Sequence, residues 1–292
     1  VIASYFSLEP RFSLRYSLNT DNSIKAGYSR TAQFINQIFN TDTPTPTSQY
    51  QLSTNYIEPQ RSHNMSIGFF KNIRNNVWET SLEVFARMVD EAFDYRDFAQ
   101  LTMNPFLETE ILDGEGRAGG VELSIKRKTG TWNGWLSYTL SRSERRIPGI
   151  NDGDWYPSNF DKPHNMSLVL NYNPNQQHTI TFNFNYSTGR PVNPPLGNYQ
   201  TDRGVVIPIF AERNQTRIPD YHRLDIAYTI GKGYRKTAKV KTSWTFSIYN
   251  VYGRNNAFSI FYTEGAFQQP VANQLAILGS AFPAVTFNLE IL

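Results

Sequence analysis

The chain has 292 residues, no cysteine and a formal net charge of +3, with 39% apolar, 18% charged and 14% aromatic residues. The lack of cysteine excludes a disulfide scaffold and a cysteine-ligated zinc protein, and the aromatic content excludes a disordered chain. A charge of +3 is far from the basic excess of a nucleic-acid-binding protein, and no run of about 18 apolar residues predicts a transmembrane helix.

Strict alternation of apolar and polar residues starts near the beginning of the chain. Phe12, Leu14 and Tyr16 occupy even positions, with Arg11 and Arg15 at odd positions around them. Because successive side chains of a strand point to opposite faces, this segment predicts a strand with one apolar and one polar face. The pattern recurs ten times, at Ile24–Tyr28, Met65–Phe69, Leu82–Met88, Val121–Ile125, Leu136–Leu140, Met166–Tyr172, Ile180–Tyr186, Leu224–Tyr228, Trp244–Ile248 and Val285–Ile291.

The connections between these eleven predicted strands alternate in length. The short ones hold Asn, Asp, Gly and Pro, the residues of tight turns: Asn19–Ser23, Arg74–Val77, Thr129–Asn133, Asn173–Gln177 and Gly231–Lys239. The long ones are rich in Pro, Asn, Gly and aromatic residues: Phe34–His63, Tyr95–Arg117, Ser143–His164, Thr188–His222 and Glu264–Ala284. Tight periplasmic turns at one end and long extracellular loops at the other are typical of an outer-membrane β-barrel.

The tenth predicted strand is unusually long. It begins near Val240, and its even phase resumes at Phe258, Ile260 and Tyr262 after a polar interruption at Asn250–Asn256. We therefore expect one tall strand with a bulge or polar break that rises above the membrane.

Two architectures produce such alternating strands, a soluble β-sandwich and a transmembrane barrel. Many of the predicted strands are long enough to match a tilted membrane-spanning strand of about 9–11 residues. We therefore predict an all-β fold, an antiparallel transmembrane β-barrel in the bacterial outer membrane.

An open sheet edge is not stable in lipid, and single-chain bacterial barrels have an even number of strands. We expect the outermost strands to pair with strands outside this sequence. The sequence begins at Val1 with no signal-peptide pattern and no initiator Met, and we expect it to be a fragment of a longer chain.

Charged residues on the polar face of the predicted strands are expected to line the barrel lumen: Arg11, Arg15, Glu83, Arg87, Glu122 and Lys126. Aromatic residues of the long loops are candidates for binding a sugar or an apolar nutrient: Trp155, Tyr156, Phe160, Tyr199, Phe210 and Tyr221. An extracellular aromatic girdle is an equally good interpretation of these six residues. Neither set contains a catalytic constellation, so we do not predict an enzyme.

Other polar clusters carry two interpretations each. His63, His164, His178 and His222 could form a metal or proton site, but no His-x-x-x-His pair supports ligation, and residues at the membrane–water boundary explain them better. Asp90, Glu91, Asp94 and Asp97 could bind calcium, or could be a solvated strand end. Arg142, Arg145 and Arg146 could meet an anionic ligand or lipopolysaccharide phosphate, or could form a solvated loop base. We predict no metal and no cofactor.

Four segments in order resemble TonB-dependent outer-membrane receptors, in particular those of Bacteroidota. They are Gly116–Leu123 with Gly134–Ser141, Asn159–Asn165, Pro219–Ile226 and Ser247–Asn256, the last being similar to the signature near the end of such a barrel. The resemblance covers essentially the whole chain. The ending Glu290-Ile291-Leu292 departs from the aromatic terminus of many outer-membrane barrels.

The resemblance implies a 22-stranded barrel filled by an N-terminal plug. Residues 1–292 would then be the C-terminal half of that barrel domain, with the plug and the first half absent from this sequence. It also implies a function: the loops bind a scarce nutrient, which is imported with energy relayed through the TonB complex to the plug. Expected partners are outer-membrane lipid, the TonB complex and a surface lipoprotein, but no nucleic acid.

Three alternatives remain beside this interpretation. A passive or structural outer-membrane barrel that pairs with another chain would have no plug. An outer-membrane enzyme would need a Ser/His or Asp/His set on one rim, which the sequence does not offer. A soluble β-sandwich would dissolve without detergent. The identity of the nutrient does not follow from the fold.

Overall fold

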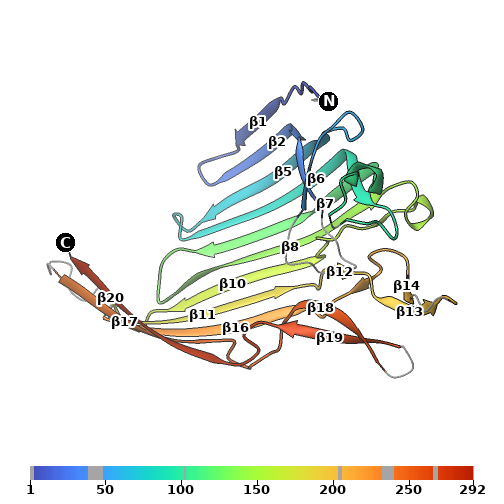
Figure 1. Cartoon of the computed structure of the whole chain (residues 1–292). Helices are drawn as coiled ribbons and strands as arrows, with labels where there is room; N and C mark the ends of the chain where they lie inside the picture. Colours follow the sequence, from blue (N-terminus) through green and yellow to red (C-terminus); the bar gives the residue numbers. More distant parts are fainter. Residues whose placement is uncertain are drawn as a thin grey trace.

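The computed structural model describes residues 3–38, 49–101, 103–202, 206–231, 240–265 and 269–291. Within these ranges, a 12-stranded antiparallel sheet forms a curved wall (Figure 1). One of the twelve, β9 (Tyr156–Pro157), pairs only with β8. The other eleven lie side by side as β1 (Arg11–Ser17), β2 (Asn22–Gln33), β5 (Gln60–Ile73), β6 (Trp78–Tyr95), β7 (Ile111–Arg127), β8 (Trp132–Arg146), β10 (His164–Tyr172), β11 (His178–Ser187), β16 (Tyr221–Ile230), β17 (Val240–Tyr249) and β20 (Phe282–Ile291).

All eleven predicted strands are confirmed, and short and long connections alternate where the structure describes them; the predicted turn at 232–239 lies outside the described residues. In the first turn the Asn19 Oδ1 accepts hydrogen bonds from the backbone nitrogens of Asp21 and Asn22, at 2.9 and 2.8 Å. Asn175 does the same for Gln177 and His178. Short side chains that satisfy the turn backbone therefore close these hairpins. The short turns lie along the left of Figure 1, and the long connections gather at its right.

The apolar face of the wall is exposed along its length. Phe12 and Leu14 of β1 are each 68% exposed, Ile67 of β5 is 57% exposed, and Phe246 of β17 is 47% exposed. No second sheet covers this face in the described part of the chain. A contiguous apolar surface of this extent needs a lipid or protein partner, which argues against the soluble sandwich. No helix among the described residues is long and apolar enough to cross a membrane.

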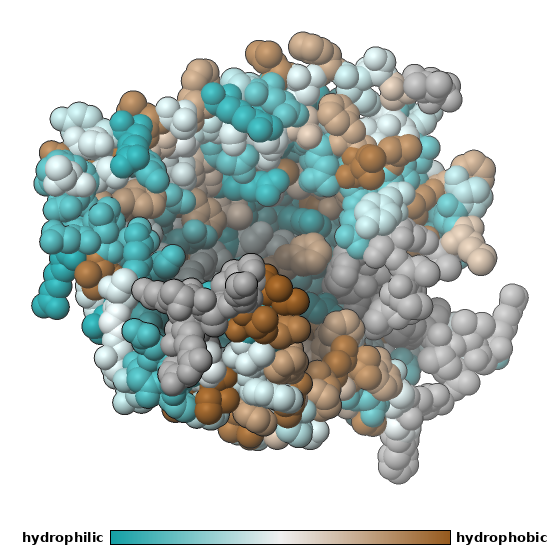
Figure 2. Space-filling view, turned by 90° about the vertical axis from the view of Figure 1, so that its left-hand side faces the viewer, coloured by the Kyte–Doolittle hydropathy of each residue, from teal (hydrophilic) through white to brown (hydrophobic). Residues whose placement is uncertain are grey.

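The wall is open in the described part of the chain. β1 and β20 are its two edges, and each pairs with a single neighbour, β2 and β17 respectively. Closure into a 22-stranded barrel therefore stays a prediction. Seen from the left of Figure 1, the molecule is hollowed in the middle, and hydrophilic atoms are visible within the hollow (Figure 2).

The single tall strand predicted from Val240 onward is wrong. β17 ends at Tyr249, and β18 (Ala257–Glu264) pairs with β19 (Pro270–Ala276) in a separate sheet. Asn250 and Gly253 both have positive φ angles, 53° and 62°, and the Gly253 N–H donates to the Asn250 carbonyl at 2.8 Å. This turn ends the strand, because a residue with φ in the left-handed region cannot continue the extended backbone. Alternation alone could not show the change of partner.

The long connections fold into a layer at one end of the wall, the loop end. Its small elements are β3 (Ile35–Ile38) with β4 (Gln49–Leu52), β12 (Pro191–Val192) with β15 (Thr216–Arg217), β13 (Pro195–Gln200) with β14 (Val206–Phe210), and the 3-10 helices η1 (Leu107–Glu110) and η2 (Asn151–Gly153). Two clusters of buried hydrophobic residues lie there: Ile38, Phe93, Tyr95 and Leu101, and Ile147, Ile150 and Tyr156. The buried hydrophobic residues of the described chain therefore gather at the loop end, where the top of β6 contributes Phe93 and Tyr95.

Candidate functional site

A β-bulge at the top of β6 prepares the site. The pairing of β6 with β7 shifts between Asp90 and Ala92, and Glu91 takes a positive φ of 58°. Below the bulge, Glu83 lies opposite Glu122 of β7, and both side chains are on the polar face of the wall. Above the bulge, Asp94 lies opposite Leu112. Leu112 is ten residues from Glu122 on β7, so it is on the same polar face. The inserted residue thus reverses the phase of β6 and turns Asp94 toward the inside of the wall.

Asp94 is the centre of a buried polar network. It is 3% exposed, and its Oδ1 lies 3.1 Å from Nη1 of Arg213, while its Oδ2 accepts the Tyr156 hydroxyl at 2.9 Å. Arg145 Nη1 lies 3.8 Å from the same Oδ2 and donates to the Phe93 carbonyl at 3.1 Å. Burial, followed by the nearby Asp94 charge, raises the pKa of the Tyr156 phenol far above its ordinary value. Tyr156 therefore acts as a neutral donor to Asp94.

Arg213 fastens distant loops to this network. Its guanidinium, 2% exposed, also contacts the Tyr95 carbonyl, 118 residues away, and Asp97 at 2.6 Å, and it lies 4.2 Å from the centre of the Tyr95 ring. Its backbone nitrogen donates to Asn151 Oδ1 at 2.7 Å. One arginine thus joins the loop after β6, the loop after β8 and the loop before β16.

Asn214 and Arg217, near Arg213 in the chain, make further contacts between the loops. Asn214 donates to Asn159 Oδ1 at 2.6 Å and to the Pro157 carbonyl at 2.9 Å. Arg217 pairs with Asp161 and donates to the Gly189 carbonyl at 3.0 Å. These bonds hold the segment 157–161 against the inside of the loop end, where it forms one wall of a cavity.

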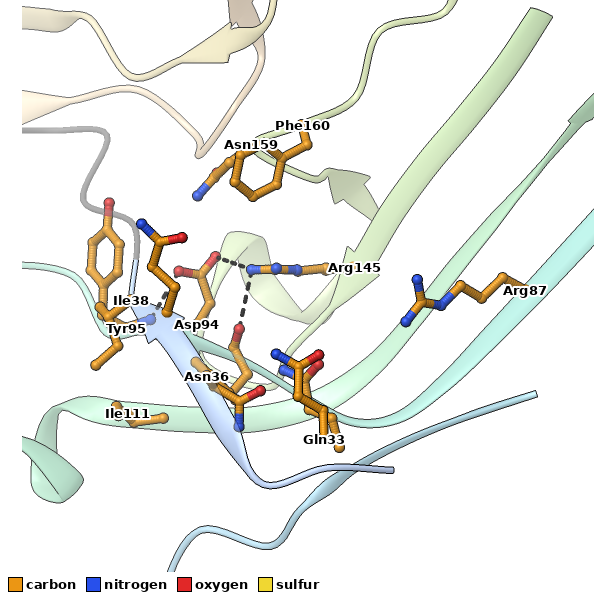
Figure 3. A pocket seen from close by; sticks show the side chains of 13 residues that line it. Gln33, Asn36, Ile38, Arg87, Asp94, Tyr95, Ile111, Arg145, Asn159 and Phe160 are labelled. Carbon is orange, nitrogen blue, oxygen red and sulfur yellow. Dashed lines mark hydrogen bonds and ion pairs between the residues drawn. The ribbon is translucent and has the colours of Figure 1, made fainter. Parts of the chain in front are cut away.

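This cavity has a volume of about 330 Å³ and a largely polar lining. Gln33 of β2, Gln60 of β5, Arg87 of β6 and Arg145 of β8 reach it from the polar face of the wall. Figure 3 shows Arg87 and Arg145 extending toward the same space, with Asn159 and Phe160 above it. The remaining lining residues are Asn36, Gln37, Ile38, Phe93, Asp94, Tyr95 and Ile111.

Charge in the cavity is uneven. The Asp94 carboxylate is already engaged by two arginines and a tyrosine. Arg87, in contrast, makes no ion pair with any described residue, and its hydrogen bond to Ser62 Oγ is long, at 3.4 Å. Among the described residues, Arg87 is therefore a charged lining residue whose charge no ion pair compensates.

Further cavities among the described residues lie at both ends of the wall. A cavity of about 430 Å³ is lined by Phe210 and Arg213, and one of about 560 Å³ by Tyr221, Arg223 and Phe258. The turn-end cavity, about 320 Å³, holds Arg15, Lys25 and Lys126 among its lining residues. The cavity at Phe210 is lined by the long connections, whereas the cavity at Tyr221 and the turn-end cavity include residues from the polar face of the wall.

The six loop aromatics are not gathered in one place. Phe160, Phe210 and Tyr221 line three different cavities, and Tyr199 is exposed on β13. Tyr156 is fully buried on Asp94. The Trp155 ring lies next to two guanidinium groups, with Cζ of Arg117 and Cζ of Arg146 at 4.0 and 5.1 Å from the ring centre. Both arginines are at strand positions on the apolar, outer face of the wall. A role for these residues in binding stays a prediction.

The six charged residues expected in the lumen share the polar face of the wall. Arg15 lies opposite Lys25, and Glu83 lies opposite both Gly68 and Glu122. The full set is Arg11, Arg15, Glu83, Arg87, Glu122 and Lys126. Only Arg87 of these reaches a loop-end cavity, since Arg15 and Lys126 line the cavity at the turns. That this face lines a closed lumen stays a prediction.

Each histidine is hydrogen-bonded to a tyrosine hydroxyl through its Nδ1. The pairs are Tyr28–His63 at 2.9 Å, Tyr138–His164 at 2.7 Å, Tyr228–His178 at 2.6 Å and Tyr252–His222 at 2.8 Å. Three of them lie where long connections meet the wall, as expected for the membrane–water boundary. The described residues contain no group of three or more His, Cys, Asp or Glu that could hold a metal.

The acidic group at the top of β6 is divided by the fold. Asp94 and Asp97 both contact Arg213, whereas Asp90 lies 3.8 Å from His63. The arginines of β8 are divided as well: Arg145 joins Asp94 inside, and Arg142 pairs with Glu144 on the outward side at 2.5 Å. Proximity in sequence was misleading here, because alternate strand positions face opposite ways. No local sequence pattern indicated a role for Gln33, Asn36, Gln60 or the Asp94–Arg213 pair.

Comparison with known proteins places this arrangement in context. A family model described as "TonB dependent receptor-like, beta-barrel" matches residues 2–251. No protein with a curated description matches the sequence. Similar solved structures include the FrpB iron transporter from Neisseria meningitidis (14% identity, TM-score 0.60, 97% of this chain and 39% of that one). Another is the ferric-catecholate import receptor Fiu from E. coli K12 (14% identity, TM-score 0.57, 96% of this chain and 34% of that one). A third is the pyoverdine receptor FpvA from Pseudomonas aeruginosa (15% identity, TM-score 0.58, 97% of this chain and 36% of that one). The chain spans about a third of the length of these structures.

Proposed function

Because the chain belongs to the family of TonB-dependent receptor-like β-barrels, we propose that it is the C-terminal part of an outer-membrane receptor that imports a scarce nutrient. Members of this family are outer-membrane receptors and transporters rather than enzymes. The plug and the first half of a 22-stranded barrel then lie outside this sequence. A Bacteroidota type of receptor stays a prediction.

One observation carries the proposal: the wall is apolar and exposed on one face, and polar on the other. The apolar face matches a lipid-facing band, and the polar face matches a wet interior that a plug could fill. The edges β1 and β20 offer unpaired backbone groups, which in lipid must pair with further strands. Such strands would be supplied by the first half of the barrel.

In this receptor the loop end faces the outside of the cell and holds the nutrient. The folded loop layer and its cavities support this orientation, because binding sites need preformed concave surfaces. Energy for import comes from the TonB complex, which acts on the plug. A surface lipoprotein is a candidate partner at the loop end, and neither the sequence nor the fold tests it.

The orientation is tested by labelling single cysteines, since the chain has none of its own. Phe106→Cys in the loop before η1 should react with a membrane-impermeant maleimide on intact cells. Asn76→Cys in the turn before β6 should react only after the outer membrane is opened. Reaction of Asn76→Cys on intact cells, or of neither variant before opening, contradicts the orientation.

The mass of the native protein and its contact with TonB test the rest. Detergent extraction from outer membranes should yield a polypeptide far heavier than 33.5 kDa that contains this sequence and a plug. Photo-crosslinking in cells should join it to TonB. A stable species of 33.5 kDa would instead favour the passive barrel that pairs with another chain.

A further inference from the structure

The cavity at Arg87 and Asp94 has the side-chain chemistry of a site for hydroxyl groups. Five amide side chains line it: Gln33, Asn36, Gln37, Gln60 and Asn159. An amide offers two donors and an acceptor in one plane, so it can bind a hydroxyl group in either sense. Five of them around one space match a ligand with several hydroxyl groups better than an apolar one.

Among these amides, Asn36 has hydrogen-bonding capacity that the described chain does not use. Its side chain is 98% buried, and neither its amide nitrogen nor its oxygen has a hydrogen-bond partner among the described residues. Buried polar groups without partners are rare in folded proteins, because they lose their bonds to water without replacement. Asn36 is a lining residue of the cavity, but its two polar atoms have almost no accessible surface, so a ligand seated there can bond them only after a shift of the side chains that cover them.

The charge of the lining favours an anion. Arg87, Arg145 and Asp94 are its three charged residues. Arg145 and Arg213 both face Asp94, so its negative charge is already compensated. Arg87 has no ion partner among the residues that the structure describes, and a planar guanidinium binds a carboxylate through two parallel hydrogen bonds.

Phe160 adds a flat apolar surface. Its ring is 62% exposed and lines the same cavity, above Arg145 in Figure 3. An exposed aromatic ring beside hydrogen-bonding amides fits the alternating apolar and polar faces of a hydroxylated ring. The volume of about 330 Å³ lies at the small end of the range for ligand sites, which suits a ligand of one or two rings.

We propose that this cavity binds a sugar acid, with the carboxylate on Arg87, hydroxyl groups on the surrounding amides and one ring face on Phe160. The inference rests on the proposed function, because a receptor needs such a site on the inside of its outer end. It goes beyond that function by naming the chemical class of the ligand and the residue that selects its charge.

Calorimetry on the native detergent-solubilised protein tests the ligand class with three matched probes. Galacturonate should bind. Galactose, which lacks the carboxylate, and cyclohexanecarboxylate, which lacks the hydroxyl groups, should each bind at least about tenfold more weakly. Glucuronate and glucose serve as a second acid and neutral pair. Equal binding of acid and neutral sugar, equal binding of cyclohexanecarboxylate, or no binding of either sugar acid overturns the proposal.

Two variants and one control assign the contacts. Arg87→Gln should lower the affinity for galacturonate about tenfold and leave that for galactose unchanged, which removes the preference for the acid. Phe160→Ala should weaken both sugars alike. Arg15→Gln makes the same change on the polar face at the turn end, and it should alter neither the affinity for galacturonate nor that for galactose. A preference for the acid that survives Arg87→Gln contradicts the proposed contact.

The binding measurement needs neither TonB nor an intact cell. If import fails but purified protein prefers galacturonate, the transport proposal is wrong and the site stands. If TonB crosslinking and loop labelling succeed while no sugar acid binds, the receptor stands and the ligand class is wrong.

Discussion

The wall and the loop end bury their residues in opposite ways. Along most of the wall, large apolar side chains such as Leu14 and Ile67 are exposed, and the hydrophobic clusters of the described residues involve this sheet at its loop-end margin, through Phe93 of β6 for example. At the loop end, Phe93 and Ile147 are buried in small clusters beside the buried ions Asp94 and Arg213. The difference shows that the wall depends on lipid for its apolar face, whereas the loop end has to fold in water by itself.

The largest effect is expected where the loop end depends on a single residue. Arg213→Leu removes the ion partner of Asp94 and the bonds to Tyr95 and Asp97, and should destabilise the loop end by about 3 kcal/mol. Hydrogen exchange should rise in the loop peptides and stay unchanged in the centre of the wall strands.

A matched control is Arg142→Leu, whose side chain is 73% exposed and whose partner Glu144 keeps Arg117. An exposed ion pair contributes about 1 kcal/mol or less, so loop exchange should barely change. Equal exchange in both variants would mean that the buried network does not hold the loops together.

The wall should fail through its lipid-facing side. Ile67 lies in the middle of β5 on the apolar face, and Ile67→Arg should cost about 2–4 kcal/mol in a bilayer. Ser66→Arg, one residue earlier, places the same charge on the polar face and should cost far less. Urea unfolding in lipid vesicles measures both. A similar loss from both variants would contradict the two-faced wall.

The same contrast explains what the sequence could predict. Alternation with a period of two is local, so it indicated all eleven wall strands and the side on which Arg87 lies. It failed at Asp94, because the extra residue Glu91 reverses the phase without a sequence signal, and at Arg213, because a contact over 118 residues leaves no local pattern. It failed again at β18, whose phase matches β17 although it pairs with β19.

A gain in stability is expected at Asn36. Asn36→Leu replaces a buried amide that has no partner in the described chain with an apolar side chain of similar size, and should stabilise the ligand-free protein by about 1 kcal/mol. The same variant should lose affinity for galacturonate. Thermal unfolding with and without the sugar acid measures both effects. Loss of stability without loss of affinity would mean that Asn36 serves the fold rather than the ligand.

The smallest effect is expected at the boundary between the two regions. The Tyr138 hydroxyl bonds His164 at 2.7 Å where the third long connection enters β10, which is where we expect lipid to give way to water. Tyr138→Phe keeps the ring and removes one hydrogen bond, so it should cost about 0.5–1.5 kcal/mol in a bilayer. Tyr172→Phe at the turn end, where the ring packs on Trp132, is the matched control and should cost less. Because water competes for an exposed histidine but lipid does not, the difference between the two variants should shrink in short-chain detergent. An unchanged difference would place His164 in bulk water, above the membrane boundary.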